Sequence, residues 1–166
     1  VDTTGAQTYG EAITLGANTS LTTNNNHVTF SNTVNSDAGQ SRALTLALGS
    51  GQATFGGEVG GSQALGAIDI TGALDLNAAV AGAASLTVSG TSDLGANVTT
   101  TGAQTYSEAV TLSGGDRTLI TTDSAVTFAN TVNSEGSQNR GLTLTLGNGQ
   151  ATFGGEVGGS QALGAI

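Results

Sequence analysis

The sequence predicts an all-β chain that coils as a parallel β-helix (β-solenoid), with about 18–22 residues in each coil. Three observations lead to this fold class. The chain repeats itself at an interval of 98 residues, strand-like triplets recur inside the repeat, and the composition holds few large side chains. Self-similarity at a fixed period is the signature of a repeat architecture. With 27 Gly, no Pro, no Cys and no Trp, any core must be narrow and filled mainly by Val, Leu, Ile and Ala.

The long repeat covers most of the chain. Val28–Ile68 returns as Val126–Ile166 with 33 of 41 positions identical, and Thr4–Leu15 returns as Thr101–Leu112. We therefore divide the chain into a first unit, residues 1–99, and a truncated second unit, residues 100–166, and we expect both to form one continuous solenoid. Small or polar residues occupy the positions that differ between Val28–Ile68 and its copy, which predicts corners or outer faces: Ser31/Ala129, Asp37/Glu135, Ala38/Gly136, Gly39/Ser137, Ser41/Asn139, Ala43/Gly141, Ala47/Thr145 and Ser50/Asn148.

Triplets in which inward positions flank one outward residue mark the first strand of each coil. Five successive intervals between them, from Leu46 to Leu144, cover one full repeat, so one unit is expected to hold five coils. Alternation with period 2 is typical of strands with one buried face. The triplets begin at Val28, Leu46, Ile68, Leu86, Gln104, Val126 and Leu144.

Further alternating positions follow six to twelve residues after each triplet, so each coil is expected to hold up to three short strands. Gly, Asn, Ser and Asp separate them, and Gly and Asn accept the left-handed backbone of tight corners. Gln7 and Gln104 stand where an apolar residue is expected, so either a glutamine lies inside the coil or the register shifts there. The further positions are Leu74–Leu76, Leu94, Val110–Leu112 and Val132, then Val80 and Val98, with Phe153 and Val157 shifted by one residue.

The alternative fold is a string of immunoglobulin-like sandwiches, whose modules also hold about 100 residues. The short sub-period inside the repeat argues against it, as does the absence of Trp, Cys and Pro.

The charge excludes several classes of partner. Twelve carboxylates against three arginines give a net charge of −9. A surface that follows nucleic-acid phosphates needs clustered Lys and Arg, so we expect no nucleic-acid partner. No stretch approaches the roughly 20 apolar residues of a membrane span, so we expect no membrane insertion.

The carboxylates and the single histidine yield no catalytic, cofactor-binding or metal-ligating set. Asp75 could approach Asp69 or Asp93 on a neighbouring coil, and glycoside hydrolysis uses two carboxylates that face one cleft. Aromatic and basic substrate contacts are lacking, however, and His27 has Ala125 as its counterpart. Calcium-binding nonapeptides are absent as well. We therefore predict a non-enzymatic chain with no cofactor and no metal.

Threonine recurs at the outward position of the triplets. Outward threonine columns form the ice-binding faces of some β-solenoids, but those carry two threonines in each coil, and β-propensity accounts for a single one. The column would contain Thr8, Thr29, Thr87, Thr105, Thr127 and Thr145, with interruptions at Ala47 and Asp69.

Three segments carry a family resemblance: Thr3–Leu15 (TTGAQTYGEAITL), Val28–Ser36 (VTFSNTVNS) and Ala53–Gly72 (ATFGGEVGGSQALGAIDITG). They resemble the repeats of very large bacterial exoproteins of the filamentous haemagglutinin-like, β-helical adhesin type. The resemblance implies a right-handed parallel β-helical stalk in a secreted or surface-attached fibrous protein.

From these observations we expect a structural repeat segment of a giant extracellular protein, acting as a rigid stalk or spacer for adhesion or attachment to the bacterial cell surface. Its partners would be neighbouring repeat units of the same chain and other copies of the fibre, with any host or surface ligand bound outside this segment. The alternative is a carbohydrate-binding or carbohydrate-cleaving β-helix module.

Overall fold

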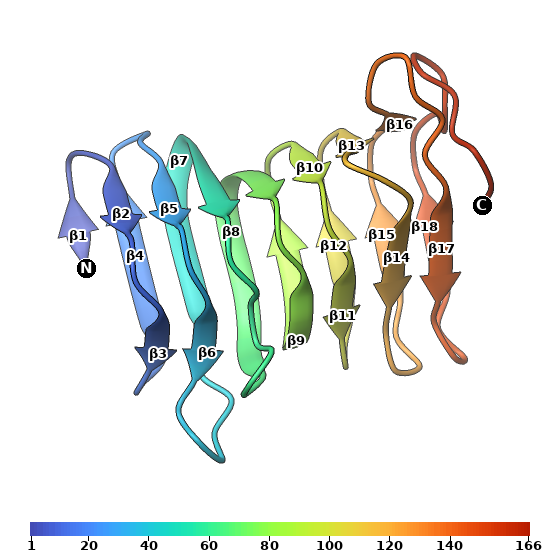
Figure 1. Ribbon diagram of the computed structural model, residues 1–166. Coiled ribbons are helices and arrows are strands. Elements are labelled where there is room, and N and C mark those ends of the chain that lie inside the picture. The colour runs from blue at the N-terminus through green and yellow to red at the C-terminus, as the bar shows by residue number, and fades with distance from the viewer.

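The computed structural model describes residues 1–166 as a coil of strands and turns without helices (Figure 1). The chain makes about seven turns of about 21 residues each. All strand pairings are parallel, for example β2 with β5 and β15 with β18. The predicted all-β parallel β-helix is therefore confirmed. The sandwich alternative is wrong, because immunoglobulin-like sandwiches are built from antiparallel sheets.

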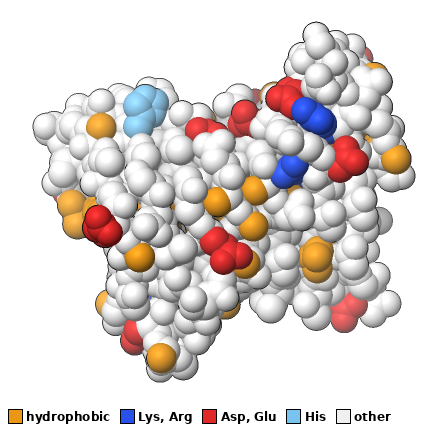
Figure 2. Space-filling view, in the orientation of Figure 1, with side chains coloured by type: hydrophobic (Ala, Val, Ile, Leu, Met, Phe, Trp, Pro, Cys, Tyr) orange, Lys and Arg blue, Asp and Glu red, His pale blue; other side chains and the backbone are white.

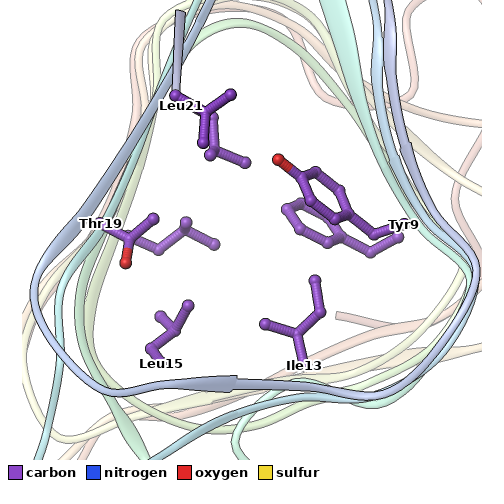
Figure 3. Close-up of a pocket in the computed structure, with 8 residues that line it drawn as sticks. Tyr9, Ile13, Leu15, Thr19 and Leu21 are labelled. Carbon is purple, nitrogen blue, oxygen red and sulfur yellow. The ribbon is translucent and has the colours of Figure 1, made fainter.

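Each turn has three faces, which give the coil a triangular cross-section (Figure 3). We name the faces A, B and C in the order in which the chain visits them. Strands on one face pair with the strands of the turns before and after. Three strands, β7 (Leu44–Phe55), β8 (Leu65–Leu76) and β9 (Val80–Val88), continue round a corner and so belong to two faces.

The remaining strands each lie on one face. Face A contains β1 (Asp2–Thr3), β4 (Thr19–Thr23), β12 (Gln104–Tyr106), β15 (Val126–Phe128) and β18 (Ala151–Phe153). Face B contains β2 (Gln7–Tyr9), β5 (Val28–Phe30), β10 (Ser92–Leu94), β13 (Val110–Leu112) and β16 (Val132–Ser134). Face C contains β3 (Ile13–Leu15), β6 (Val34–Ser36), β11 (Val98–Thr100), β14 (Arg117–Ile120) and β17 (Leu142–Thr145).

The core is a single cluster of 30 buried hydrophobic residues inside the coil. Parallel register places like side chains on top of one another, because inward positions of one turn pair with inward positions of the next. Two aromatic stacks result. Tyr9, Phe30 and Phe55 stack on face B with ring centroids 5.3 and 5.0 Å apart. Tyr106, Phe128 and Phe153 stack on face A at 5.3 and 5.1 Å.

The corners use left-handed backbone where the chain turns sharply. Asn25 (φ 58°) lies beside Gly49 (φ 60°) of the next turn, and the Asn25 Oδ1 accepts a hydrogen bond from Ser50 N at 3.0 Å. A Cβ on Gly49 would overlap the Asn25 side chain. In the second unit Asp123 (φ 52°) takes the place of Asn25 and accepts from the backbone of the following turn. Glycine and asparagine thus stand at corners as predicted.

The predicted column of triplets is correct in the middle of the chain. Four of the triplet positions lie one above another on face A: Ile68, Leu86, Gln104 and Val126. Leu46 lies on the same face but pairs with Ile70, so the predicted register is wrong there by one inward position.

Two further triplets lie on other faces than predicted. Val28 lies on face B, where it pairs with Ala53, and Leu144 lies on face C, where it pairs with Leu119. The prediction is wrong for both because the turns differ in length more than the sequence indicates. The turn from Val28 to Ala53 is longer than the turn from Leu86 to Gln104, and the extra residues lie at its corners.

The 98-residue unit does not hold the predicted five whole coils. Val28 lies on face B, whereas its counterpart Val126 lies on face A. Likewise Leu44 lies on face A and its counterpart Leu142 on face C. Between Val28 and Val126 the chain completes four turns and then passes only two further faces, so one unit spans four and two-thirds turns. The four completed turns are marked on face B by Ala53, Leu74, Ser92 and Val110.

The differences between Val28–Ile68 and its copy avoid the core, as predicted. All eight pairs of differing residues are exposed or half-buried. The interior of this segment is thereby kept the same in both units, although the two units stand in different rotational positions.

The stacked column should dominate stability. Truncating Phe128, which lies between Tyr106 and Phe153, to alanine leaves a cavity, and we expect Phe128→Ala to lower the free energy of unfolding by about 3–5 kcal/mol. The exposed acid Glu156 is the control, and Glu156→Ala should change the free energy of unfolding by less than about 0.5 kcal/mol. Chemical denaturation followed by circular dichroism measures both. Equal effects of the two substitutions would contradict this assignment of the core.

Candidate functional site

The three aspartates considered as catalytic pairs are only partly brought together. Asp75 and Asp93 are direct neighbours on face B, where β8 pairs with β10. Asp69 lies on face A between Thr45 and Thr87, so it does not form a pair with Asp75.

Local donors satisfy the two neighbouring carboxylates. Asn77 Nδ2 donates to Asp75 Oδ1 at 2.9 Å, Thr54 Oγ1 donates to Asp75 Oδ2 at 3.4 Å, and the Ser113 hydroxyl donates to Asp93. These hydrogen bonds offset part of the repulsion between like charges on adjacent strands. The arrangement is that of two hydrogen-bonded carboxylates on the outer side of face B, away from any pocket.

The histidine and the outward threonines also have structural roles. His27 is exposed, and its Nδ1 accepts a hydrogen bond from Gln52 N at 3.1 Å, so it caps a backbone donor of the next turn. The predicted single threonine column is divided among the faces. Face A carries Thr87, Thr105, Thr127 and Thr152 in register, face B carries Thr8, Thr29 and Thr54, and Thr145 lies on face C.

The structure contains one hollow, of about 150 Å³, at the end of the coil that holds the N-terminus. Figure 3 looks into it and shows Tyr9, Ile13, Leu15 and Leu21 pointing into the coil from three sides. Seven of its eight lining residues are hydrophobic, and none has a charged side chain. The hollow is therefore the uncovered core of the first turn.

Glutamine lies inside the coil, which settles the alternative left open by the sequence. Gln104 is 0% exposed, and its Nε2 donates to Ile120 O at 2.9 Å and to Thr100 Oγ1 at 3.2 Å. The Tyr106 hydroxyl donates to Gln104 Oε1 at 3.3 Å. A buried amide is tolerated because both its ends are hydrogen-bonded.

The same network recurs in the first unit. Gln7 Nε2 donates to Thr22 O and to Thr3 Oγ1, each at 3.0 Å, and the Tyr9 hydroxyl donates to Gln7 Oε1 at 2.9 Å. Gln7 lies in the first turn and is 7% exposed. The recurring network fixes one corner of each unit from within.

Two loops project from the coil, and the alternation pattern of the sequence does not mark them. We call them the arms: residues 37–43 between β6 and β7, and residues 135–141 between β16 and β17. Figure 1 shows them at opposite sides of the rod. Each begins with an acid that pairs with an arginine five residues later. Arg42 Nε lies 2.7 Å from Asp37 Oδ1, and Arg140 forms an ion pair with Glu135.

Each arm is also held by the following turn. Gln63 Nε2 donates to Gln40 O at 2.7 Å, and Gly39 N donates to Gln63 Oε1 at 3.3 Å. In the second unit Gln161 makes the same two contacts, to Gln138 O at 2.8 Å and from Ser137 N at 3.3 Å. The arms are therefore ordered loops, and the same ion pair and hydrogen bonds hold them in both units.

The ion pairs shift the titration of the arm carboxyls. The hydrogen bond from Arg42 holds the pKa of Asp37 below its ordinary value, and Arg140 does the same for the pKa of Glu135. Such pairs stabilise the arms above the ordinary carboxyl pKa and lose this contribution as the pH falls through the lowered pKa. The effect is small because all four side chains are about a third exposed.

One sequence signal could have revealed the arms. The acid changes from Asp37 to Glu135 between the copies, whereas the arginine five residues later stays the same. The change keeps the negative charge, so an ion pair with the arginine is possible in both copies.

The third arginine is also engaged within the fold. Arg117 stands in register with the inward Leu142, and its guanidinium donates to Gly95 O at 2.6 Å and to Gly115 O at 3.0 Å. Burial lowers the pKa of Arg117. On the face shown in Figure 2, acidic side chains lie scattered, and the basic ones lie beside acids. No group of three or more His, Cys, Asp or Glu side chains is placed to hold a metal ion.

The buried glutamine should contribute more to stability where it is fully enclosed than where it is near the end of the coil. Gln104→Leu keeps the size of the side chain but removes a donor to Ile120 O and the acceptor of the Tyr106 hydroxyl, so we expect the free energy of unfolding to fall by about 1–3 kcal/mol. Gln7→Leu is the matched control in the first turn, where water reaches the partners, and should cost less. Denaturant titration of both variants measures the difference. A neutral or stabilising Gln104→Leu would contradict the role of the network.

Tyr106 should make the fold sensitive to alkali. Its complete burial raises the pKa of Tyr106 well above the ordinary tyrosine value of about 10. The unfolded chain therefore loses the phenolic proton first, so stability is full below about pH 10 and falls as the pH rises above it. We expect Tyr106→Phe to show a shallower fall in unfolding free energy between about pH 9 and 11. Tyr9→Phe, at a half-buried ring, should change the slope less. Unchanged slopes in both variants would contradict this assignment.

The structure contains no helix with the length and apolar character needed to cross a membrane. Comparison of the chain with family models, with curated proteins and with solved structures finds no match.

Proposed function

We propose that this chain is a rigid spacer segment of an extracellular or bacterial cell-surface fibrous protein, of the filamentous haemagglutinin-like adhesin type. The observation that supports it is the continuity of the parallel ladders. On face A, paired strands run without a break from β1 to β18. The two chain termini lie at opposite ends of the rod (Figure 1).

The proposed mechanism is mechanical. Backbone hydrogen bonds between turns run along the rod axis on all three faces, for example Gln7 N to His27 O at 3.0 Å on face B and Ile13 N to Thr33 O at 2.8 Å on face C. Bending the rod stretches the bonds on one face and compresses the core on the opposite side. In a solenoid each turn contacts only its neighbours, so length grows in proportion to the number of turns.

The surface supports a role in spacing. The arginines are engaged within the fold, and the net charge of −9 keeps the rod soluble and repels similar rods that approach side by side. The aromatic rings, which a carbohydrate-binding module would place along an outer groove, are stacked inside the coil. In this proposal the partners of the segment are the neighbouring units of the same fibre, and adhesive contacts lie elsewhere.

Chain extension tests the spacer role. Ile166 is the counterpart of Ile68, so Asp69–Ile166 can be appended after Ile166 without interrupting the repeat. Each appended unit of four and two-thirds turns should lengthen the rod by about 22 Å, at about 4.8 Å for each turn. Small-angle scattering and atomic force microscopy on chains with zero, one, two and three appended units measure the increment. A maximum dimension that grows with the square root of the number of units would indicate flexible joints and contradict the proposal.

A further inference from the structure

The two arms leave the coil at different corners. The first arm connects face C to face A, between β6 and β7, whereas the second connects face B to face C, between β16 and β17. Equivalent residues of the two units therefore point in different directions around the axis. The cause is the length of the unit. Because one unit makes four and two-thirds turns, each feature of the second unit lies one face earlier in the order A, B, C than the same feature of the first unit.

The same rotation applies inside the coil. The aromatic stack of the first unit lies on face B and that of the second unit on face A. The longer turns, which hold the extra corner residues, are displaced by one face in the same way as the aromatic stacks. Val34 pairs with Val59 on face C, while its counterpart Val132 pairs with Val157 on face B. A unit of five whole turns would place all these bulky features along one side of the rod.

We propose that the fractional unit length sets the phase of the fibre, by which we mean the rotation about the rod axis from one unit to the next. This rotation distributes the arms over all three sides of the fibre and keeps the fibre straight. The axial spacing between successive arms is about 22 Å, and each arm is rotated by one-third of a turn from the last. Three units, or fourteen turns, return an arm to its first corner. This inference rests on the proposed function, because it assumes that units of this length follow one another along a fibre.

The sequence provides a matched way to change the phase. Between Leu86 and Val110 the chain advances one face for every six residues, with Ser92, Val98 and Gln104 as the intermediate positions. A second copy of Ser92–Asn97 placed after Asn97, the one-face insertion, therefore makes the unit five whole turns. A second copy of Leu86–Ala103 placed after Ala103, the whole-turn insertion, lengthens the unit but leaves the phase unchanged.

Distances between two spin labels test the phase in the chain itself, which has no cysteine. Ala38→Cys and Gly136→Cys place labels at equivalent exposed positions of the two arms, and a side chain at Gly136 meets nothing within 4 Å. Arms on different corners should be more than about 30 Å apart, because a face of six residues adds roughly 20 Å across the rod to the axial spacing of about 22 Å. The one-face insertion should shorten this distance to about 24 Å, the rise of five turns.

The whole-turn insertion is the control for folding and for phase. It should keep the labels on different corners and lengthen their separation by a few ångströms. A native distance of about 24 Å, or a one-face insertion that leaves the distance unchanged, would overturn the proposal. The native chain and the whole-turn insertion decide the matter even if the one-face variant does not fold.

Microscopy of extended chains tests the consequence for shape. Rods with three appended native units should be straight, whereas rods built from units with the one-face insertion should curve to one side. Equal curvature would overturn the role in straightness. Rods that lengthen by about 22 Å for each unit but fail this comparison would refute the inference and leave the spacer function standing.

Discussion

Each turn of this chain is held to the next by parallel backbone hydrogen bonds, and their register decides what lies inside the coil. Gln104 pairs with Leu86 on one side and Val126 on the other, so an inward position is followed along the axis by inward positions only. A slip of one residue would turn every side chain of a strand to the opposite side. The core column, the aromatic stacks and the outward threonines all follow from this one constraint.

The register also explains how a narrow core tolerates polar residues. Gln104 occupies a slot that apolar residues fill in the adjacent turns, yet its amide finds partners in Thr100, Tyr106 and the backbone of the next turn. The interior is thus a set of columns whose members need matching width, in which the Gln104 amide is hydrogen-bonded while the buried Ser92 hydroxyl has no partner. Variation between Val28–Ile68 and its copy is confined to positions outside these columns, because only there does a polar change leave the stacking intact.

The turns of the coil determine both the length of the rod and the direction in which its surface features project. Length follows from the number of turns, since every turn adds the spacing of one strand. Direction around the axis follows from the number of faces that a unit contains. The arms show both properties: their ion pairs and glutamine contacts are reproduced in each unit, while the corner from which they project changes. The spacing and the rotation of surface features are therefore encoded in one quantity, the length of the repeat.

Alternation and spacing along the chain predict the parallel β-helix, up to three strands in each turn, and the stacking of Ile68, Leu86, Gln104 and Val126. Alternation with period 2 shows which residues face inward, and a regular step shows which of them stack. Three features could not be predicted in this way: Val28 lies on face B, Asp75 adjoins Asp93 and not Asp69, and the unit is not a whole number of turns. The physical reason is that corners absorb variable numbers of residues. The alternation of buried and exposed residues does not indicate how many residues a corner contains, and only hydrogen bonding between turns fixes which strand pairs with which.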